Sequence, residues 1–107
     1  MVAKRFDIWL ISLDPVQGSE IAKTRPCVII SPDIMNRYLA TVLIAPLTST
    51  VRNYPSRIDC MVSDKNGQIV LDQIRAVDKS RLLKNIGTLD SPTAFQVCEL
   101  LKEMFDY

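Results

Sequence analysis

The polar stretch GSEIAKTRP (residues 18–26) separates two apolar runs, residues 8–13 and 27–30. Gly18 permits the positive φ that the tip of a hairpin often needs. The final proline favours extended backbone at Arg25, just where the second apolar run begins. This pattern predicts two strands joined by a polar loop, with a guanidinium held at the mouth of the second strand.

The charges of this loop allow two interpretations. Glu20 and Arg25 are close enough in sequence to meet across the loop, and the resulting surface ion pair would contribute little. The same guanidinium has a fork of donors that matches phosphate oxygens. The loop alone favours the ion pair.

Composition predicts one domain, residues 1–107, with a small core, because 48% of the 107 residues are apolar and 23% are charged. The chain shows neither an apolar run of membrane-spanning length nor a signal-peptide pattern, so we expect a cytoplasmic protein without membrane contacts. Cys27, Cys60 and Cys98 suit reduced core thiols better than a disulfide framework. Without histidine or a close cysteine pair, we expect no metal site and no cofactor.

The net charge of +1 hides an asymmetry. The first 89 residues carry 12 bases and 8 acids, whereas residues 90–107 carry one base and four acids. The excess positive charge therefore lies in the first 89 residues, which is compatible with an anionic ligand on one face.

Hydrophobic patterning predicts a mainly β (α+β) fold, a five- to six-stranded antiparallel barrel-like sheet closed by a C-terminal helix. The expected strands are residues 7–13, 27–31, 40–46, 58–62, 68–77 and 86–89. Short helical segments are expected at 34–38 and 78–84. Asn66-Gly67 predicts a hairpin turn, because this pair tolerates positive φ.

The last segment has the signature of an amphipathic helix over residues 92–105. Ser91 offers a capping hydroxyl before a first-turn proline. Apolar residues recur at helical spacing and should pack on the sheet. They are Ala94, Val97, Cys98, Leu101 and Phe105.

Two polar residues, Asp72 and Gln73, interrupt the otherwise apolar run 68–77. They predict a bulge or a side chain that faces something polar. Cross-strand hydrogen bonding is the simpler explanation for Asp72, and the role of Gln73 stays open.

Five blocks of this chain resemble, in order, those of the MazF/PemK-type toxins of type II toxin–antitoxin systems. They are Asp7-Ile8-Trp9, Asp14-Pro15, Gly18-Ser19-Glu20 with Arg25-Pro26, Pro46-Leu47-Thr48-Ser49, and Leu71-Asp72-Gln73-Ile74-Arg75 with Asp78. The resemblance spans nearly the whole chain and implies the small SH3-like or CcdB-like β-barrel of that family. It also implies a homodimeric, metal-independent endoribonuclease (an mRNA interferase) that cuts single-stranded RNA at short sequences and is neutralised by an antitoxin protein. Phe6 stands where the family commonly has glycine.

The family's catalytic arginine and threonine fall on Arg25 and Thr48, and its loop glutamate on Glu20. Because the chain has no histidine, a two-histidine ribonuclease mechanism is excluded. Arg25 suits stabilisation of phosphate charge, and Thr48 can donate a neutral hydrogen bond to the same phosphate. Without the resemblance, Thr48 would be read as a strand-end hydroxyl that satisfies backbone groups. Glu20 is a candidate base or an orienter of Arg25, and Lys23 is a candidate acid only if desolvated.

Loop residues of suitable type are candidates for RNA binding, by stacking on bases or by contact with phosphates. They are Lys23, Thr24, Ser49, Arg52, Tyr54, Arg57 and Gln73. For the stretch 52–57 an ordinary solvated turn is an equal alternative. Gln73 could instead bond to the catalytic loop.

Two functions of other kinds remain open. A CcdB-like barrel of the same fold could poison or regulate a protein target such as gyrase without catalysis. A module that holds single-stranded RNA without cutting it is the second alternative.

Overall fold

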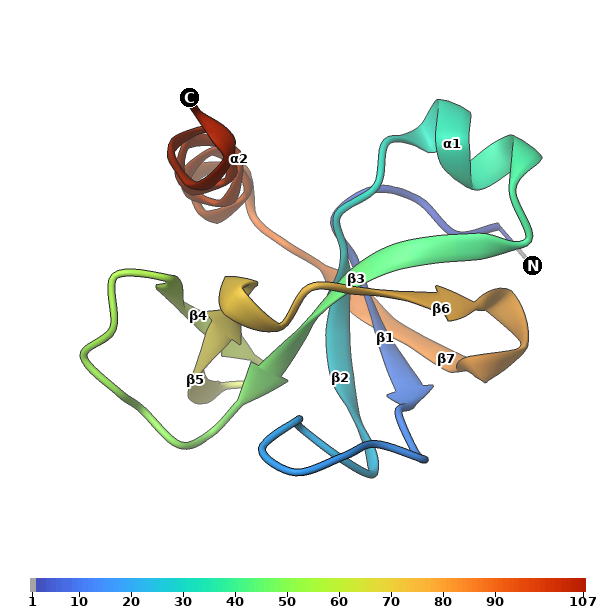
Figure 1. Ribbon diagram of the computed structural model, residues 1–107, viewed down its shortest axis with the longest axis horizontal. Coiled ribbons are helices and arrows are strands. Elements are labelled where there is room, and N and C mark those ends of the chain that lie inside the picture. Colours follow the sequence, from blue (N-terminus) through green and yellow to red (C-terminus); the bar gives the residue numbers. More distant parts are fainter. Residues whose placement is uncertain (1) are drawn as a thin grey trace.

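The computed structural model describes residues 2–107, in which seven strands form one curled antiparallel sheet (Figure 1). The strands are β1 (Asp7–Ser12), β2 (Thr24–Ile29), β3 (Thr41–Thr48), β4 (Arg57–Val62), β5 (Lys65–Val70), β6 (Arg75–Asp78) and β7 (Leu82–Thr88). The helices are α1 (Asp33–Tyr38) and α2 (Ser91–Phe105), with short 3-10 turns η1 (Leu71–Gln73) and η2 (Lys79–Arg81). The predicted barrel-like fold with a C-terminal helix is confirmed, although the expected strand number was too low.

The central strand of the sheet is β3. The sheet order is β4-β5-β3-β2-β1-β7, and β6 pairs with the first half of β3. One edge of β3 pairs with β2, and the other pairs first with β6 and then with β5. The run expected as one strand, 68–77, therefore follows β3 in two pieces, and η1 is the interruption that Asp72 and Gln73 predicted.

Successive residues of the central strands enter two different apolar clusters. Ile8 and Val28 belong to the cluster beneath α2, whereas their neighbours Trp9 and Cys27 belong to the cluster inside the curl of the sheet. This alternation follows from the two-residue period of a strand. It confirms that the run 27–31 is covered on both sides.

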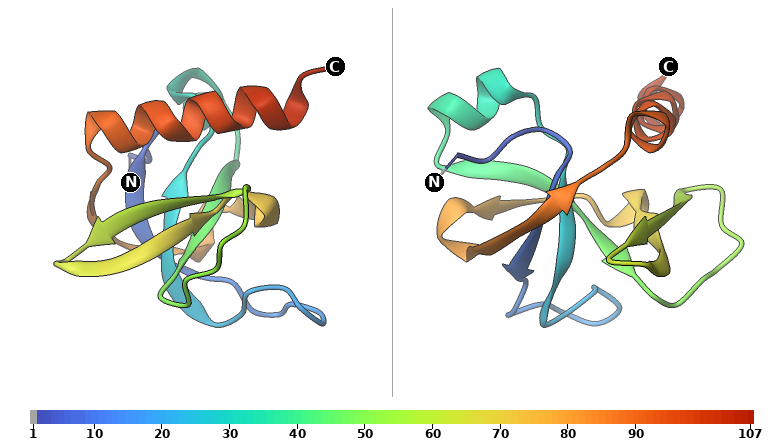
Figure 2. Two further views of the ribbon diagram at one scale, coloured as in Figure 1. Left: turned by 90° about the vertical axis from the view of Figure 1, so that its left-hand side faces the viewer. Right: turned by 180° about the vertical axis from the view of Figure 1, so that it is seen from behind.

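Helices and loops lie at opposite ends of the molecule. In Figure 1 both α1 and α2 lie above the sheet, while the β1–β2 loop (residues 13–23) hangs from the other end. Figure 2 shows α2 crossing above the β4–β5 hairpin. Its buried residues are Ala94 and Val97. No described helix is long and apolar enough to cross a membrane. The β1–β2 loop therefore lies at the end of the molecule away from the helices, and the β3–β4 loop runs along its side (Figure 1).

The hairpin turn predicted at Asn66-Gly67 was wrong. The turn between β4 and β5 is Ser63-Asp64, whose φ angles are +51° and +64°, and Val62 pairs with Lys65. Gly67 lies within β5 for another reason. A Cβ at this position would stand 2.8 Å from the backbone oxygen of Thr48, so only glycine lets β5 approach the end of β3.

Three predictions near the C-terminus also need correction. The helix expected over 78–84 is only the 3-10 turn η2. The apolar Leu82 begins β7 instead and is buried in the cluster inside the curl of the sheet. The cap of α2 is Asp90 rather than Ser91, since the Asp90 carboxylate accepts from Thr93 N. Hydrogen bonds from the Thr93 hydroxyl and then from Thr93 N lower the pKa of Asp90. Phe105 is 75% exposed, because α2 extends past the sheet before its last turn.

Candidate functional site

Arg25 and Thr48 lie side by side at the loop end of the sheet. Pairing of Cys27 with Pro46 fixes the register of β2 and β3, and two residues further the same register sets Arg25 opposite Thr48. Both residues line a cavity of about 330 Å³. Residues that are 23 positions apart in sequence are thus brought together by strand pairing.

The Arg25 guanidinium is half-buried and anchored at one nitrogen. Its Nε donates to the backbone oxygen of Ala22 at 3.0 Å. Among residues 2–107 no acceptor is recorded for its two terminal nitrogens. The side chain is therefore oriented by its own loop, with the donor fork left for an anion.

Cys27, two residues along β2, is a buried thiol. Burial raises its pKa to about 12, and the nearby charges of Arg25 and Arg75 oppose that rise. The thiol is therefore neutral at physiological pH, so Cys27 belongs to the framework beneath Arg25. This confirms the expectation of reduced core thiols for Cys27, and Cys60 is likewise buried and free.

The predicted ion pair between Glu20 and Arg25 is wrong. Glu20 Oε1 accepts from the backbone nitrogen of Gln17 at 2.5 Å, and its neighbour Ile21 is held by Gln73. The only ion pair within residues 2–107 is Lys102–Glu99 on α2. Glu20 lines a different cavity of about 380 Å³, which does not include Arg25. The β1–β2 loop turns back on itself between Gln17 and Glu20, and the Glu20 carboxylate is used in the hydrogen bond that closes this turn.

The Thr48 hydroxyl fits both interpretations made from the sequence. Its Oγ1 accepts from the backbone nitrogen of Thr50 at 3.1 Å, as a strand-end hydroxyl does. Accepting that bond leaves the O–H free to donate. Thr48 is half-buried at the cavity, so the hydroxyl is both fixed and accessible.

The β3–β4 loop (residues 49–56) carries several of the RNA-binding candidates. Ser49 lines the cavity with Arg25. Tyr54 is half exposed, and the Arg57 guanidinium stacks on its ring at 5.1 Å while donating to the backbone oxygen of Thr50 at 3.3 Å. Arg57 therefore braces this loop, whereas the Arg52 side chain is exposed.

The remaining candidates belong to the β1–β2 loop or touch it. Lys23 and Thr24 are exposed. Gln73, in η1, accepts from Ile21 N through Oε1 at 2.7 Å, which is the contact with the catalytic loop considered above. Asp72 accepts from Ser56 Oγ at 2.8 Å, so its partner is a loop residue rather than one across a strand pair.

Sequence reasoning missed the contribution of the β4–β5 hairpin. Ser63, Lys65, Asn66 and Gly67 line the same cavity as Arg25 and Thr48. The turn predicted at Asn66-Gly67 concealed this contribution, because it would have placed the tip of the hairpin away from the cavity. The positive φ now found at Ser63-Asp64 carries no comparable sequence signal.

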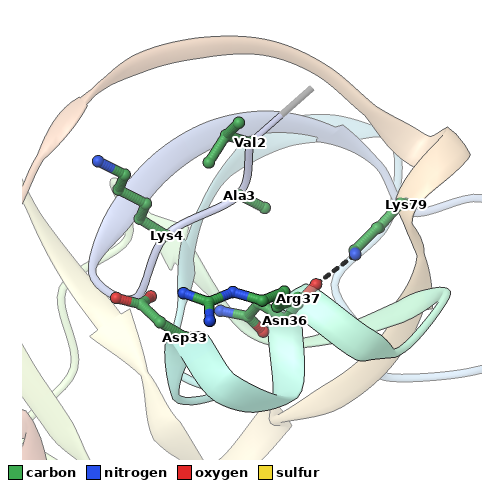
Figure 3. A pocket seen from close by; sticks show the side chains of 7 residues that line it. All are labelled: Val2, Ala3, Lys4, Asp33, Asn36, Arg37 and Lys79. Carbon is green, nitrogen blue, oxygen red and sulfur yellow. Dashed lines mark hydrogen bonds between the residues drawn. The ribbon is translucent and has the colours of Figure 1, made fainter.

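Another cavity lies beside α1, and none of the predicted site residues line it. It measures about 320 Å³ and is bordered by Lys4, Arg37 and Lys79 with a single carboxylate, Asp33 (Figure 3). Lys79 Nζ already donates to the backbone oxygen of Asn36. Within residues 2–107 no cluster of three or more His, Cys, Asp or Glu side chains could hold a metal ion.

Comparison with known proteins gives a consistent result for the whole chain. Residues 4–105 match the family described as PemK-like, MazF-like toxin of type II toxin–antitoxin system. The chain is 33% identical over 108 residues to Endoribonuclease EndoA of Bacillus subtilis, covering 95% of this chain and 93% of the relative. It is 39% identical over 92 residues to Endoribonuclease MazF of Staphylococcus saprophyticus, covering 80% and 77%.

Solved structures show the same fold at lower sequence identity. A crystal structure of MazF from Deinococcus radiodurans superposes with a TM-score of 0.87 at 20% identity, covering 100% of this chain and 99% of the other. An endoribonuclease in complex with its cognate antitoxin, from a mycobacterial species, gives a TM-score of 0.79 at 24% identity, covering 94% and 91%. The curled sheet and its C-terminal helix are therefore common to these proteins.

Proposed function

The chain belongs to the PemK-like, MazF-like toxin family of type II toxin–antitoxin systems, and from this premise we propose that it is the toxin, an endoribonuclease that cuts single-stranded RNA. The observation that carries the proposal is the placement of Arg25 and Thr48 beside one cavity, at positions that face each other when the β2–β3 register is continued. Both groups are hydrogen-bond donors of the kind that a phosphodiester would meet. The relatives named as endoribonucleases support this reading over a CcdB-like protein poison.

The reaction needs no metal in this proposal. The ribose 2′-hydroxyl attacks its own phosphorus, the bond to the 5′-oxygen of the next nucleotide breaks, and the products are a 2′,3′-cyclic phosphate and a 5′-hydroxyl. Negative charge grows on the non-bridging oxygens as the bond forms. The terminal nitrogens of Arg25 and the Thr48 hydroxyl donate to those oxygens and lower the barrier.

Proton transfer needs a base at the 2′-hydroxyl and an acid at the leaving 5′-oxygen. As the loop lies, Glu20 is bonded to Gln17 N, so it does not orient Arg25; Ala22 O does so. Glu20 acts as the base in this scheme only when the loop rearranges on RNA. Lys23 is exposed, so it lacks the desolvation that would make it an effective acid.

Base selection is assigned to the loops around the cavity. Tyr54 and Arg52 are exposed on the β3–β4 loop, and Lys23 and Thr24 on the β1–β2 side. Tyr54 offers one face of its ring to a base, since Arg57 covers the other. Ser49 borders the cavity itself.

The partners follow from the family. We infer a homodimer acting on mRNA in the cytoplasm. We also infer a cognate antitoxin, acidic and partly disordered, that excludes RNA by covering the basic loops. The antitoxin complex of the mycobacterial endoribonuclease supports such a partner.

The test is cleavage of a long unstructured RNA in excess chelator, with both new ends identified. Arg25→Ala should lower the single-turnover rate by roughly 100- to 1,000-fold, because one charged donor to the developing oxyanion is lost. Thr48→Val should cost roughly ten- to a hundred-fold, the value of one hydrogen bond to a charged group. RNA binding should persist in both variants.

Two controls with the same residue types are available away from the cavity. Arg37 on α1 and Thr41 at the start of β3 are exposed and lie far from the cavity, so Arg37→Ala and Thr41→Val should cleave normally. A parent protein that binds RNA without ever cutting it would make the chain an RNA-holding module. A parent that neither binds nor cuts would revive the protein-poison alternative.

A further inference from the structure

We propose that Gln68 is a positioning residue for the cleavage site, holding the β3–β4 loop so that the Thr48 hydroxyl is fixed. This proposal rests on the proposed function for its catalytic consequence. Its structural part, the fixing of the loop, can be measured without RNA.

Gln68 is a buried amide whose bonds reach out to the loop. It is only 5% exposed. Its Oε1 accepts from Arg52 N at 3.0 Å, and its Nε2 donates to Arg52 O at 3.0 Å. The same Nε2 donates to Asp59 Oδ1 at 2.9 Å. One side chain thus satisfies both backbone groups of a loop residue 16 positions away.

The face of the sheet explains why the loop covers this amide. Ile69, the next residue, enters the cluster beneath α2, so Gln68 must point to the opposite side. Gln68 pairs with Thr48 on β3 and with Asp59 on β4. Directly paired residues share a face, so Thr48, Gln68 and Asp59 form one polar row across three strands.

This row connects Gln68 to the proposed catalytic hydroxyl. Gln68 fixes the loop at Arg52, and two residues earlier Thr50 N donates to Thr48 Oγ1 at 3.1 Å. Fixing Arg52 holds the Thr50 amide against the hydroxyl. That bond occupies an acceptor site of Oγ1 and directs its O–H elsewhere.

An amide is the side chain that this position requires. Leucine has a similar size but would leave the N–H and C=O of Arg52 without their side-chain partner, which favours opening of the loop. The neighbours Ile69 and Val70 are apolar and fully buried, so the polar side chain is particular to position 68 in this part of β5. Two of the three hydrogen bonds that Gln68 makes therefore hold the loop, and the third joins it to Asp59 on β4.

The test uses Gln68→Leu. The control is Gln96→Leu, the same substitution at an exposed position on α2. Amide hydrogen exchange at Thr50 and Arg52 should accelerate in Gln68→Leu, with protection in β1 and β2 unchanged. For RNA cleavage we expect kcat to fall roughly ten- to a hundred-fold, with KM changed far less, because the hydroxyl is misplaced rather than the substrate lost. Gln96→Leu should match the parent in both measurements.

Several outcomes would overturn the proposal. Unchanged exchange at Thr50 and Arg52 would show that Gln68 does not hold the loop. Faster exchange with a normal kcat would show that the loop does not position Thr48, and a change in KM alone would assign Gln68 to binding. Loss of protection throughout the sheet would make its role purely structural. A failure of the proposed function shows itself differently, since then the parent protein would not cleave RNA either.

Discussion

The two loops beside the cavity are held at different points. The β1–β2 loop is fixed at its ends, where Arg75 donates to Leu13 O and Arg81 to Ser12 O and Asp14 O, and at Ile21 by a single bond to Gln73. Between these points residues 17 and 20 bond only to each other. The β3–β4 loop is instead fixed along its middle, at Thr50 and Arg52.

This difference gives the two loops different roles at the site. The β3–β4 loop continues directly from Thr48, so holding its middle keeps the hydroxyl in one place. The β1–β2 loop carries Glu20, which does not reach Arg25 as the loop lies. A segment with few tertiary bonds opens at low free-energy cost. Residues 15–20, which make no recorded hydrogen bond outside this loop within residues 2–107, are therefore the part free to adapt to RNA.

The largest effect should come from adding a side chain where β5 approaches the end of β3, next to the β3–β4 loop. Gly67→Ala places a Cβ 2.8 Å from the backbone oxygen of Thr48, and the two strands must separate. We expect the free energy of unfolding to fall by about 1–3 kcal/mol, as for other overpacked positions, and cleavage to fall with it. Urea unfolding measures the first change and single-turnover cleavage the second.

Met61→Ala is the matched control, because this exposed residue on the neighbouring strand β4 does not line the cavity. A Gly67→Ala protein as stable and as active as Met61→Ala would show that the close approach of β5 to Thr48 is not needed.

A smaller effect is expected at the adaptable loop. Gln73→Leu removes the bond to Ile21 N, and a single hydrogen bond contributes about 1 kcal/mol. Exchange of the Ile21 amide should accelerate several-fold while exchange at Arg52 stays unchanged. Gln17→Leu, an exposed change in the same loop, should alter neither amide.

If Gln73→Leu also released Arg52, the two loops would form one cooperative unit. The contrast drawn between them would then be wrong.

The smallest effect tests the framework beneath both loops. The pKa of Cys27 is about 12 in the folded protein against 9.0 for the free thiol, mainly because of burial. A raised folded pKa gives stability that is complete below about pH 9 and is lost as the pH rises towards 12, since the unfolded thiol ionises first. The unfolding free energy should therefore fall less between about pH 8 and pH 10 in Cys27→Ala than in the parent.

Urea unfolding at the two pH values makes this comparison, with native alkylation as a second measurement. In the folded protein the half-buried Cys98 should react before Cys27. Equal alkaline slopes for parent and Cys27→Ala would mean that β2 is more open beneath Arg25 than its burial implies.

Local patterns in the sequence were sufficient for much of the architecture. The alternation and β-branched content of the strands and the helical spacing of Ala94 and Val97 depend on neighbours a few residues apart, and they predicted the sheet and α2. The lack of histidine excluded a two-histidine ribonuclease mechanism from the sequence alone. The resemblance then pointed to Arg25 and Thr48, which strand pairing brings together.

What the sequence left undecided depends on partners that lie far apart along the chain. Asn66-Gly67 looked like a turn, yet Gly67 is needed for the approach of Thr48, and Gln68 drew no attention although it holds Arg52. Glu20 is a local exception, since it was expected at Arg25 and bonds instead to Gln17, three residues earlier. Side-chain type and local propensity are properties of the sequence. Which polar groups meet was decided only by the register of β2, β3 and β5, because register sets every partner across the sheet at once.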